Sequence, residues 1–223
     1  MSTLTKLREG IGQFGWRFLF RAICWRFPDW ILRYENAYLV STDKLHVDVP
    51  IPSDITFRLA EPRDAENLSV VNISPNTVSE RLSMGDRCVV AERNGKILAM
   101  LWSATGKLYL HEAGTVIDTG NGAFYRYNSF TLPEERQKGL YSGCSVALYE
   151  SYVAEGRHSV FGAISVFNLP SIAASKKLGN KIVGESVLVS VIGIKFIYYK
   201  KWPLPVQRLT IIPGKPPKNM RVI

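Results

Sequence analysis

The sequence predicts a mixed α/β fold in which helices flank one central sheet. Three observations indicate this class: strand-like runs recur along the chain, helix boundary signals separate them, and an early Asn94-Gly95 turn is typical of a β-hairpin. The chain has 223 residues and is 46% hydrophobic, which is enough for one mid-sized domain with a buried core. It contains no repeat, which excludes the fibrous and solenoid classes.

Most of the chain between residues 55 and 199 reads as strand or helix. The expected strands alternate polar and apolar residues or form short apolar runs. Their ranges are 55–60, 88–93, 96–103, 107–111, 123–132, 159–166, 181–191 and 194–199. Side chains alternate between the two faces of a strand, so Tyr125 and Tyr127 share one face of the strand 123–132.

Helices are expected between several of these strands. Glu61-Pro62-Arg63-Asp64 indicates a helix start, because proline suits the first turn of a helix. A second helix is expected over about 140–154 with Gly156 after it. A third is expected over 169–178 with Gly179 at its end.

Composition divides the chain into three regions. Residues 1–50 are rich in Trp, Phe and Arg and are expected to form an amphipathic, helical N-terminal extension. Residues 51–201 hold the expected strands and helices of the domain. Residues 202–223 contain five prolines and are expected to form a basic, irregular tail.

The positive charge is concentrated at the carboxyl end. The formal net charge is +9, and the residues from Lys176 onward contain ten Lys and Arg and one acid, Glu185. Such an end can meet nucleic acid, anionic lipid or an anionic cofactor, or can simply keep the chain soluble. No zinc finger or RNA-binding signature accompanies it, so a basic nucleic-acid-binding protein is the least favoured function.

The cysteines and the amino terminus indicate the compartment. Cys24, Cys88 and Cys144 are an odd number, lie far apart and form no CxxC pair, which argues against a disulfide framework and against a metal site. Arg17 and Arg21 interrupt the first hydrophobic stretch, so no secretory signal is visible. We therefore expect a cytoplasmic protein, with peripheral contact to a membrane left open.

The most informative segment runs from Phe130 to Ser142 and reads FTLPEERQKGLYS. A strand ends at Pro133, a basic loop follows, and a helix begins near Leu140. The free N–H groups and the positive dipole end of that helix point to one place, and Gly139 lets the backbone approach an anion closely. We expect a pyrophosphate site here; an ordinary loop with solvated basic residues is the alternative.

This segment resembles the pyrophosphate loop of the GNAT superfamily of acyl-CoA N-acyltransferases. The family pattern is Arg or Gln, two residues, Gly, one residue, and then Gly or Ala. Arg136, Gly139 and Tyr141 fall on these three positions. Tyr141 departs from the small third residue, so its side chain must turn away from the phosphates for the match to work.

A second segment strengthens the resemblance. About 30 residues later the family has an Asn that opens a short helix running to Leu-Gly, and Asn168 to Leu178-Gly179 reproduces this spacing. A plain capped helix explains the same residues without a cofactor. The resemblance covers about 55–199 and implies a single GNAT-like domain with a mixed central sheet.

The resemblance also implies an activity and a set of binding residues. The enzyme would move an acetyl or other acyl group from acyl-CoA to the amine of a small molecule by direct attack, with acetyl-CoA as co-substrate and no metal ion. The implied cofactor-binding residues are Phe130, Thr131, Leu132, Gln137, Lys138, Gly139, Leu140, Tyr141, Ser142 and Asn168.

The catalytic residues are where the sequence departs from the family. Many relatives carry a Tyr acid seven residues after the helix-opening Asn, and this chain has Ser175 there. A hydroxyl protonates a leaving thiolate poorly, so a catalytically impaired acyl-CoA sensor or scaffold is the alternative function. For the base we favour Glu112, which follows the strand 107–111, and then Tyr127. A solvated carboxylate and plain aromatic packing are the competing interpretations.

Residues 16–27 form an amphipathic segment in the N-terminal region. Arg17 and Arg21 are four residues apart, and an apolar stripe opposes them, formed by Phe20, Ile23, Cys24 and Phe27. We expect a short helix, ended by Pro28, that packs on the domain or on a second subunit with its arginines solvated. A helix lying in a membrane interface is the alternative.

Overall fold

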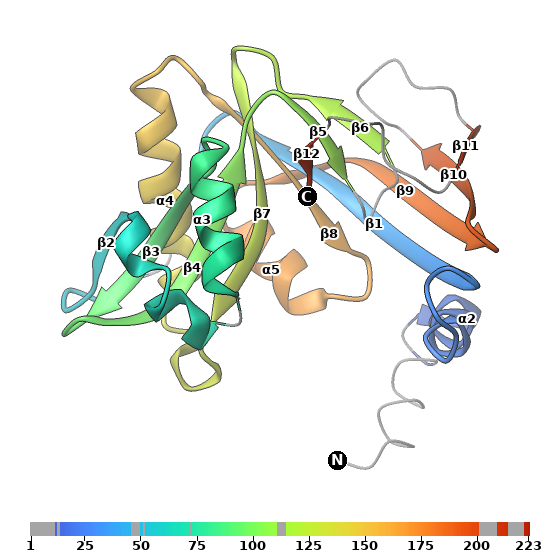
Figure 1. The fold of residues 1–223 in the computed structure, drawn as a ribbon, viewed down its shortest axis with the longest axis horizontal. Coiled ribbons are helices and arrows are strands. Elements are labelled where there is room, and N and C mark those ends of the chain that lie inside the picture. Colours follow the sequence, from blue (N-terminus) through green and yellow to red (C-terminus); the bar gives the residue numbers. More distant parts are fainter. Residues whose placement is uncertain are drawn as a thin grey trace.

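The computed structural model describes residues 12, 14–45, 50, 52–71, 73–110, 115–200, 209–213 and 221–223. Their strands form a large mixed sheet and a small one (Figure 1). The large sheet has the order β11-β10-β9-β1-β8-β7-β4-β3-β2, and the small sheet has the order β12-β5-β6. The strands are β1 (Leu32–Thr42), β2 (Thr56–Leu59), β3 (Arg87–Arg93), β4 (Lys96–Ala104), β5 (Lys107–Leu110), β6 (Thr115–Asp118), β7 (Ala123–Thr131), β8 (Ser159–Ser165), β9 (Lys181–Val191), β10 (Ile194–Lys200), β11 (Leu209–Pro213) and β12 (Arg221–Val222).

Helices cover both faces of the part of the large sheet that β7, β4, β3 and β2 form, with α3 in front and α4 behind in Figure 1. The helices are α2 (Trp16–Cys24), α3 (Pro75–Ser83), α4 (Leu140–Val153) and α5 (Leu169–Lys177), with 3₁₀ turns η1 (Pro62–Asp64), η2 (Asn67–Val71) and η3 (Pro133–Glu135). The mixed α/β class expected from the sequence is therefore confirmed.

The main core lies between the sheet and the helices on its two faces. Its largest fully buried side chains include Trp102 of β4, Phe124 of β7 and Tyr152 of α4. The rings of Phe124 and Tyr152 stack at a centroid distance of 4.2 Å and hold α4 against the sheet. The β3–β4 hairpin is confirmed: Asn94 and Gly95 both have positive φ, as this two-residue turn requires.

The chain before residue 50 is not an extension separate from the sheet. β1 lies between β8 and β9 and pairs antiparallel with both. The sequence does not predict this strand, because Arg33 and Glu35 interrupt its apolar pattern. In the structure these two side chains face each other, with Arg33 Nε 3.6 Å from Glu35 Oε1, and the buried side chains of Ala37 and Leu39 follow them.

The carboxyl-terminal residues that the structure describes also belong to the sheets, although an irregular tail was expected. β11 pairs antiparallel with β10, and β12 pairs in parallel with β5. Ile223 packs against the buried cluster under the β5–β6 hairpin. These strands were missed because their partners are remote in sequence and the segments are short and rich in proline. The rest of the range 202–223 lies outside the described residues.

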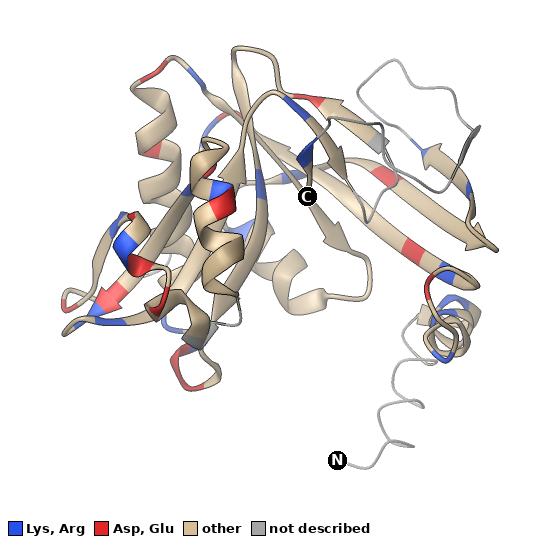
Figure 2. Cartoon of the chain, in the orientation of Figure 1, with Lys and Arg blue, Asp and Glu red and all other residues tan. Residues whose placement is uncertain are grey.

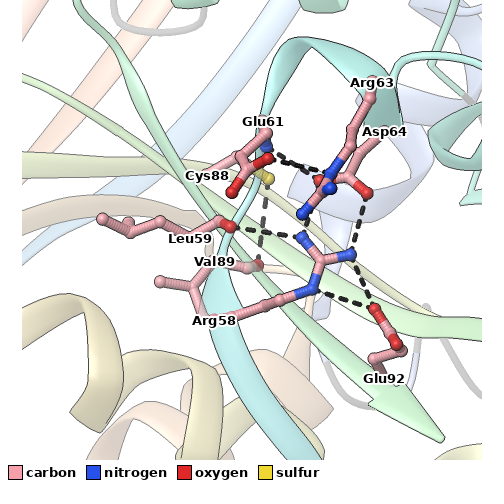
Figure 3. Close-up of polar contacts among 8 residues, drawn as sticks. All are labelled: Arg58, Leu59, Glu61, Arg63, Asp64, Cys88, Val89 and Glu92. Carbon is pink, nitrogen blue, oxygen red and sulfur yellow. Dashed lines mark hydrogen bonds and ion pairs between the residues drawn. The ribbon is translucent and has the colours of Figure 1, made fainter. Parts of the chain in front are cut away.

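A polar network ties the edge strand β2 to its neighbours (Figure 3). We expected a helix to begin at Glu61; the chain instead forms the single 3₁₀ turn η1, closed by reciprocal hydrogen bonds between Glu61 and Asp64. Arg58 of β2 donates two hydrogen bonds to Asp64, at 2.7 and 2.8 Å, and two to Glu92 of β3. The next α-helix, α3, begins only at Pro75.

We expect Arg58→Met to lower the free energy of unfolding by about 2–3 kcal/mol at pH 7, because it leaves the buried Asp64 carboxylate without its cation. Arg58 holds the pKa of Asp64 below its usual range, so this contribution is present at neutral pH and is lost as the pH falls through the lowered value. Urea unfolding at pH 7 and below pH 4 measures both effects. Arg63→Met is the control, since the exposed Arg63–Glu61 pair contributes under about 1 kcal/mol; equal losses in the two variants would contradict the prediction.

Candidate functional site

Strands β7 and β8 part in the middle of the large sheet. Their parallel pairing runs from Ala123 opposite Ser159 to Arg126 opposite Gly162 and then stops. Beyond that point β7 stays paired with β4 as far as Thr131, and β8 stays paired with β1 as far as Ser165. Residues 127–131 and 163–165 therefore have one paired edge each, and the edges they turn toward each other carry no ladder. Backbone groups on such edges can pair with a ligand.

A β-bulge at Asn128 marks the place where the strands part. Leu101 of β4 faces Ser129 and Trp102 faces Tyr127, so Asn128 is the extra residue of β7. Its φ of 41° lies in the left-handed region, which Asn tolerates better than most residues. The bulge lies in the β4–β7 ladder and bends β7 locally, while the residues on either side of it stay paired with β4. This bend fits a β7 that parts from β8 without leaving β4.

A loop with anion-binding geometry follows β7 directly. Gln137 and Gly139 both have positive φ, of 65° and 78°, and Gly139 is the N-cap of α4 without any side-chain cap. The N–H groups in the first turn of a helix have no intrahelical acceptor. Left-handed residues in such a loop turn successive N–H groups to one side and form an anion-binding hollow. Arg136 and Lys138 add positive charge beside it.

The side chains around this loop are arranged as follows. Tyr141, the departure from the family pattern, packs against the main core, so its ring turns inward as the match required. Arg136 Nε donates to the carbonyl of Thr131 over 3.3 Å, and Lys138 contacts Glu135 at 3.2 Å. The hydrogen bond from Lys138 and the nearby Arg93 lower the pKa of Glu135, which therefore carries its charge at neutral pH.

The other implied cofactor residues lie at two places. Phe130 and Thr131 end β7, Leu132 follows them, and the backbone from Gln137 to Ser142 forms the loop and the first turn of α4. Asn168 lies apart from these residues, at the start of α5. Its side-chain oxygen accepts a hydrogen bond from Ser171 N at 3.2 Å, so it serves as the N-cap of its own helix.

A buried polar cluster lies at the last rung of the β7–β8 pairing, and the sequence analysis did not find it. Arg126 is 5% exposed, and its Nη2 donates to Asn180 Oδ1 at 2.7 Å. Asn180 in turn donates to the carbonyl of Ser175 on α5. Within the described part of the chain, Arg126 Nε, Arg126 Nη1 and Ser175 Oγ are buried without a hydrogen-bond partner. Leaving charged donors unpaired costs free energy, so these atoms suit an acceptor supplied by a ligand.

Tyr127, one of the two predicted catalytic residues, lies directly after this rung but its hydroxyl is engaged. It donates to the buried carboxylate of Asp86, which also pairs with Arg221 of β12. Burial, together with the negative charge of Asp86, raises the pKa of Tyr127 far above its usual value. Burial also raises the pKa of Asp86, against the effect of its partners. The phenol therefore keeps its proton at neutral pH and is poorly suited to act as a base.

Glu112, the other predicted catalytic residue, lies outside the described residues, as does His111 beside it. The strand expected before them is present as β5, and it pairs antiparallel with β6. The base assignment therefore stays a prediction.

No family model matches the sequence, and no curated protein matches it. Solved structures do match in shape. A Drosophila protein has a TM-score of 0.51 at 16% identity, and the match covers 72% of this chain and 52% of that one, so the chain spans about half its length. A putative GNAT-family acetyltransferase from Novosphingobium aromaticivorans has a TM-score of 0.49 at 15% identity, covering 71% and 66%. Aminoglycoside N-acetyltransferase AAC(6')-Iy has a TM-score of 0.47 at 14% identity, covering 59% and 90%.

At these identities the likeness concerns the fold alone. The structure has the mixed central sheet that was expected, and the loop expected before the helix at 140 opens α4.

The bulge leads to a test at Asn128. We expect Asn128→Val to lower the free energy of unfolding by about 1–2 kcal/mol, because a β-branched residue is strained at positive φ. Asn128→Gly is the matched control and should stay within about 0.5 kcal/mol of the wild type, since glycine adopts this conformation readily. Urea unfolding compares the two; equal stability of the Val and Gly variants would show that the bulge is absent in solution.

Proposed function

We propose that the protein is an acyl-CoA N-acyltransferase that moves an acyl group, acetyl in the simplest case, to the amine of a small molecule. One observation carries the proposal: the pairing of β7 with β8 stops at Arg126, and the free edge of β7 that begins there leads to a loop whose backbone can hold a pyrophosphate. An extended ligand with an anionic end can then pair with the free edge of β7 and end on the first turn of α4.

The described residues fit acyl-CoA at both ends of this path. The hollow formed by Gln137 and Gly139 suits the pyrophosphate, and the free edge at 127–131 suits the amide groups of the pantetheine arm. The unpartnered N–H groups of Arg126 lie at the closed end of the path. When bound, the co-substrate supplies a thioester, whose acyl carbon an amine can attack.

The chain's own groups can assist this attack in three ways. Backbone N–H groups near the bulge can donate to the thioester carbonyl. The free N–H groups of Arg126 can hold the leaving thiolate, in the region where relatives place a Tyr acid and this chain has Ser175. A base must take the proton of the amine, and Glu112 remains our candidate for it. Tyr127 is better placed to support the site through Asp86 than to move a proton.

One observation favours a second function, an acyl-CoA-binding protein without catalysis. Ser175 stands where relatives often carry the acid, and it is 2% exposed. A buried serine cannot supply a proton to a thiolate efficiently. Thiol release from acetyl-CoA with a panel of small amines distinguishes the two functions: release above the buffer rate supports the enzyme, and tight CoA binding without release supports the sensor.

The loop assignment predicts that Gly139→Val weakens CoA binding at least tenfold, because a branched side chain strains the left-handed N-cap and fills the anion hollow. Calorimetric titration with CoA measures this loss of affinity. Gly156→Val is the matched control: Gly156 follows the other end of α4 with φ 80°, so the backbone strain is the same but no phosphate is near. Equal CoA affinity in both folded variants would remove the pyrophosphate from this loop.

The role of Arg126 predicts that Arg126→Gln lowers kcat by about 10²-fold while CoA affinity changes less than about threefold. The glutamine is too short to reach Asn180, but it also removes the buried charge with its unpaired donors, so the free energy of unfolding should stay within about 1 kcal/mol. Ser175→Ala is the control in the same cluster and should cost less than about tenfold in kcat. Unchanged turnover in a folded Arg126→Gln variant would assign Arg126 a structural role only.

A further inference from the structure

Helix α2 turns an apolar stripe away from the protein. Trp16, Leu19 and Ile23 recur at helical spacing and are 69%, 41% and 48% exposed. Large apolar side chains that are neighbours on an exposed helix face indicate an interaction surface rather than a scatter of surface residues.

The arginines of α2 point the other way, toward the sheet. Arg21 lies 3.9 Å from Glu35 of β1, and Arg17 lies 3.7 Å from Glu185 of β9. In Figure 2 the long strands above α2 carry acidic segments, drawn in red. The arrangement reverses part of our expectation, which placed the arginines in solvent and the whole apolar stripe on the domain.

The expected packing holds only for part of that stripe. Phe20 contacts Tyr34 at a ring distance of 5.2 Å, and Cys24 is buried. Ile23 and Phe27 are exposed. The inward side of α2 is mixed, because Phe18 contacts Phe167 at a ring distance of 6.1 Å on the same side as Arg21, so aromatic packing and ion pairs together hold the helix.

The exposed stripe continues past the end of the helix. We call the whole surface the tryptophan patch; it consists of Trp16, Leu19, Ile23, Phe27 and Trp30, whereas Trp25 stacks on Arg21 on the other side of the helix. Phe27 and Trp30 are 45% and 65% exposed. The tip of the β9–β10 hairpin adjoins the patch, since Ile192 N donates to Ile31 O at 2.9 Å, and Ile192 itself is 73% exposed.

Two cations lie beside the patch. Arg26 is exposed within it, whereas Arg17 and Arg21 turn toward Glu185 and Glu35. Asp29, the one acid in residues 14–31, lies 4.0 Å from Arg33. Beside Trp16 a groove of about 480 Å³ lies between α2, β1 and α5; its walls are mainly aromatic and aliphatic, and Arg17 and Lys176 are its two cations.

We propose that the tryptophan patch docks the protein on the surface of an anionic lipid bilayer. Two of the five patch residues are tryptophans, which favour the boundary between lipid headgroups and acyl chains. The flanking cations complement lipid phosphates. A two-fold contact with a second copy would instead bring Arg26 and Lys176 of each chain toward their own copies, at an electrostatic cost. Among the described residues no helix is long and apolar enough to cross a bilayer, so the contact is peripheral.

The test is sedimentation with vesicles of phosphatidylcholine alone and with about a third of phosphatidylglycerol. We expect binding that requires the anionic lipid and weakens as salt is raised. Leu19→Ser with Ile23→Ser should lower the partition coefficient at least tenfold. Arg26→Gln should lower it about fivefold. The control is Leu59→Ser with Met84→Ser, which removes two side chains of similar exposure, 45% and 39%, elsewhere on the surface.

Three results would overturn the proposal. In the first, the wild-type protein does not bind anionic vesicles. In the second, the two double variants bind the vesicles equally well. In the third, light scattering shows a dimer of the wild type, and the variant Leu19→Ser with Ile23→Ser is a monomer. The last result would assign the patch to a second copy. Because the changed residues are exposed, circular dichroism and the melting temperature should stay those of the wild type. The lipid result does not depend on CoA binding, so it stands or fails separately from the proposed activity.

Discussion

The structure depends on strand β7, which is paired with its two neighbours, β4 and β8, over different lengths. β7 keeps its hydrogen bonds to β4 as far as Thr131, whereas its bonds to β8 end at Arg126. The extra residue Asn128 lies in the β4–β7 ladder and bends β7 close to where its pairing with β8 ends. The free edge of β7, the loop after it and the first turn of α4 follow in sequence, so one irregular residue places both parts of the candidate site.

β1 connects this site with the opposite end of the molecule. It occupies the second edge of β8 as far as Ser165, which keeps β8 in the sheet where it parts from β7. Its other edge pairs with β9, and Glu35 and Glu185 on these two strands hold the arginines of α2. The helix that carries the tryptophan patch thus packs on β1 and β9, and β1 pairs with β8, which borders the proposed acyl-CoA site. Binding of the patch to a bilayer would therefore fix the orientation of this site relative to the membrane.

Two buried polar clusters near β7 differ in whether their polar atoms have hydrogen-bond partners within the chain. We interpret the complete cluster as structural and the incomplete one as part of the candidate site. Asp86 accepts from Tyr127 and pairs with Arg221, so this cluster is closed within the chain and joins the carboxyl-terminal strand to the sheet. Only one side-chain nitrogen of Arg126, Nη2, donates to Asn180, and its Nε and Nη1 have no partner among the described residues. A buried cation with free donors lowers stability unless an acceptor arrives, which is the usual compromise at a binding site.

The sequence by itself determined the elements whose signals are local. The Asn94-Gly95 hairpin, the loop at Gly139 and the capped helix after Asn168 follow from the conformations that these residues adopt most easily. Only the tertiary structure decided the rest, because those features depend on partners far along the chain. β1 is a strand through its pairing with β8 and β9. Arg126 meets Asn180 across 54 residues. The periodicity of α2 defines two faces, but the partners on the sheet and before α5 decide which one turns inward: Tyr34 and Phe167 contact its aromatic rings, and Glu35 pairs with Arg21.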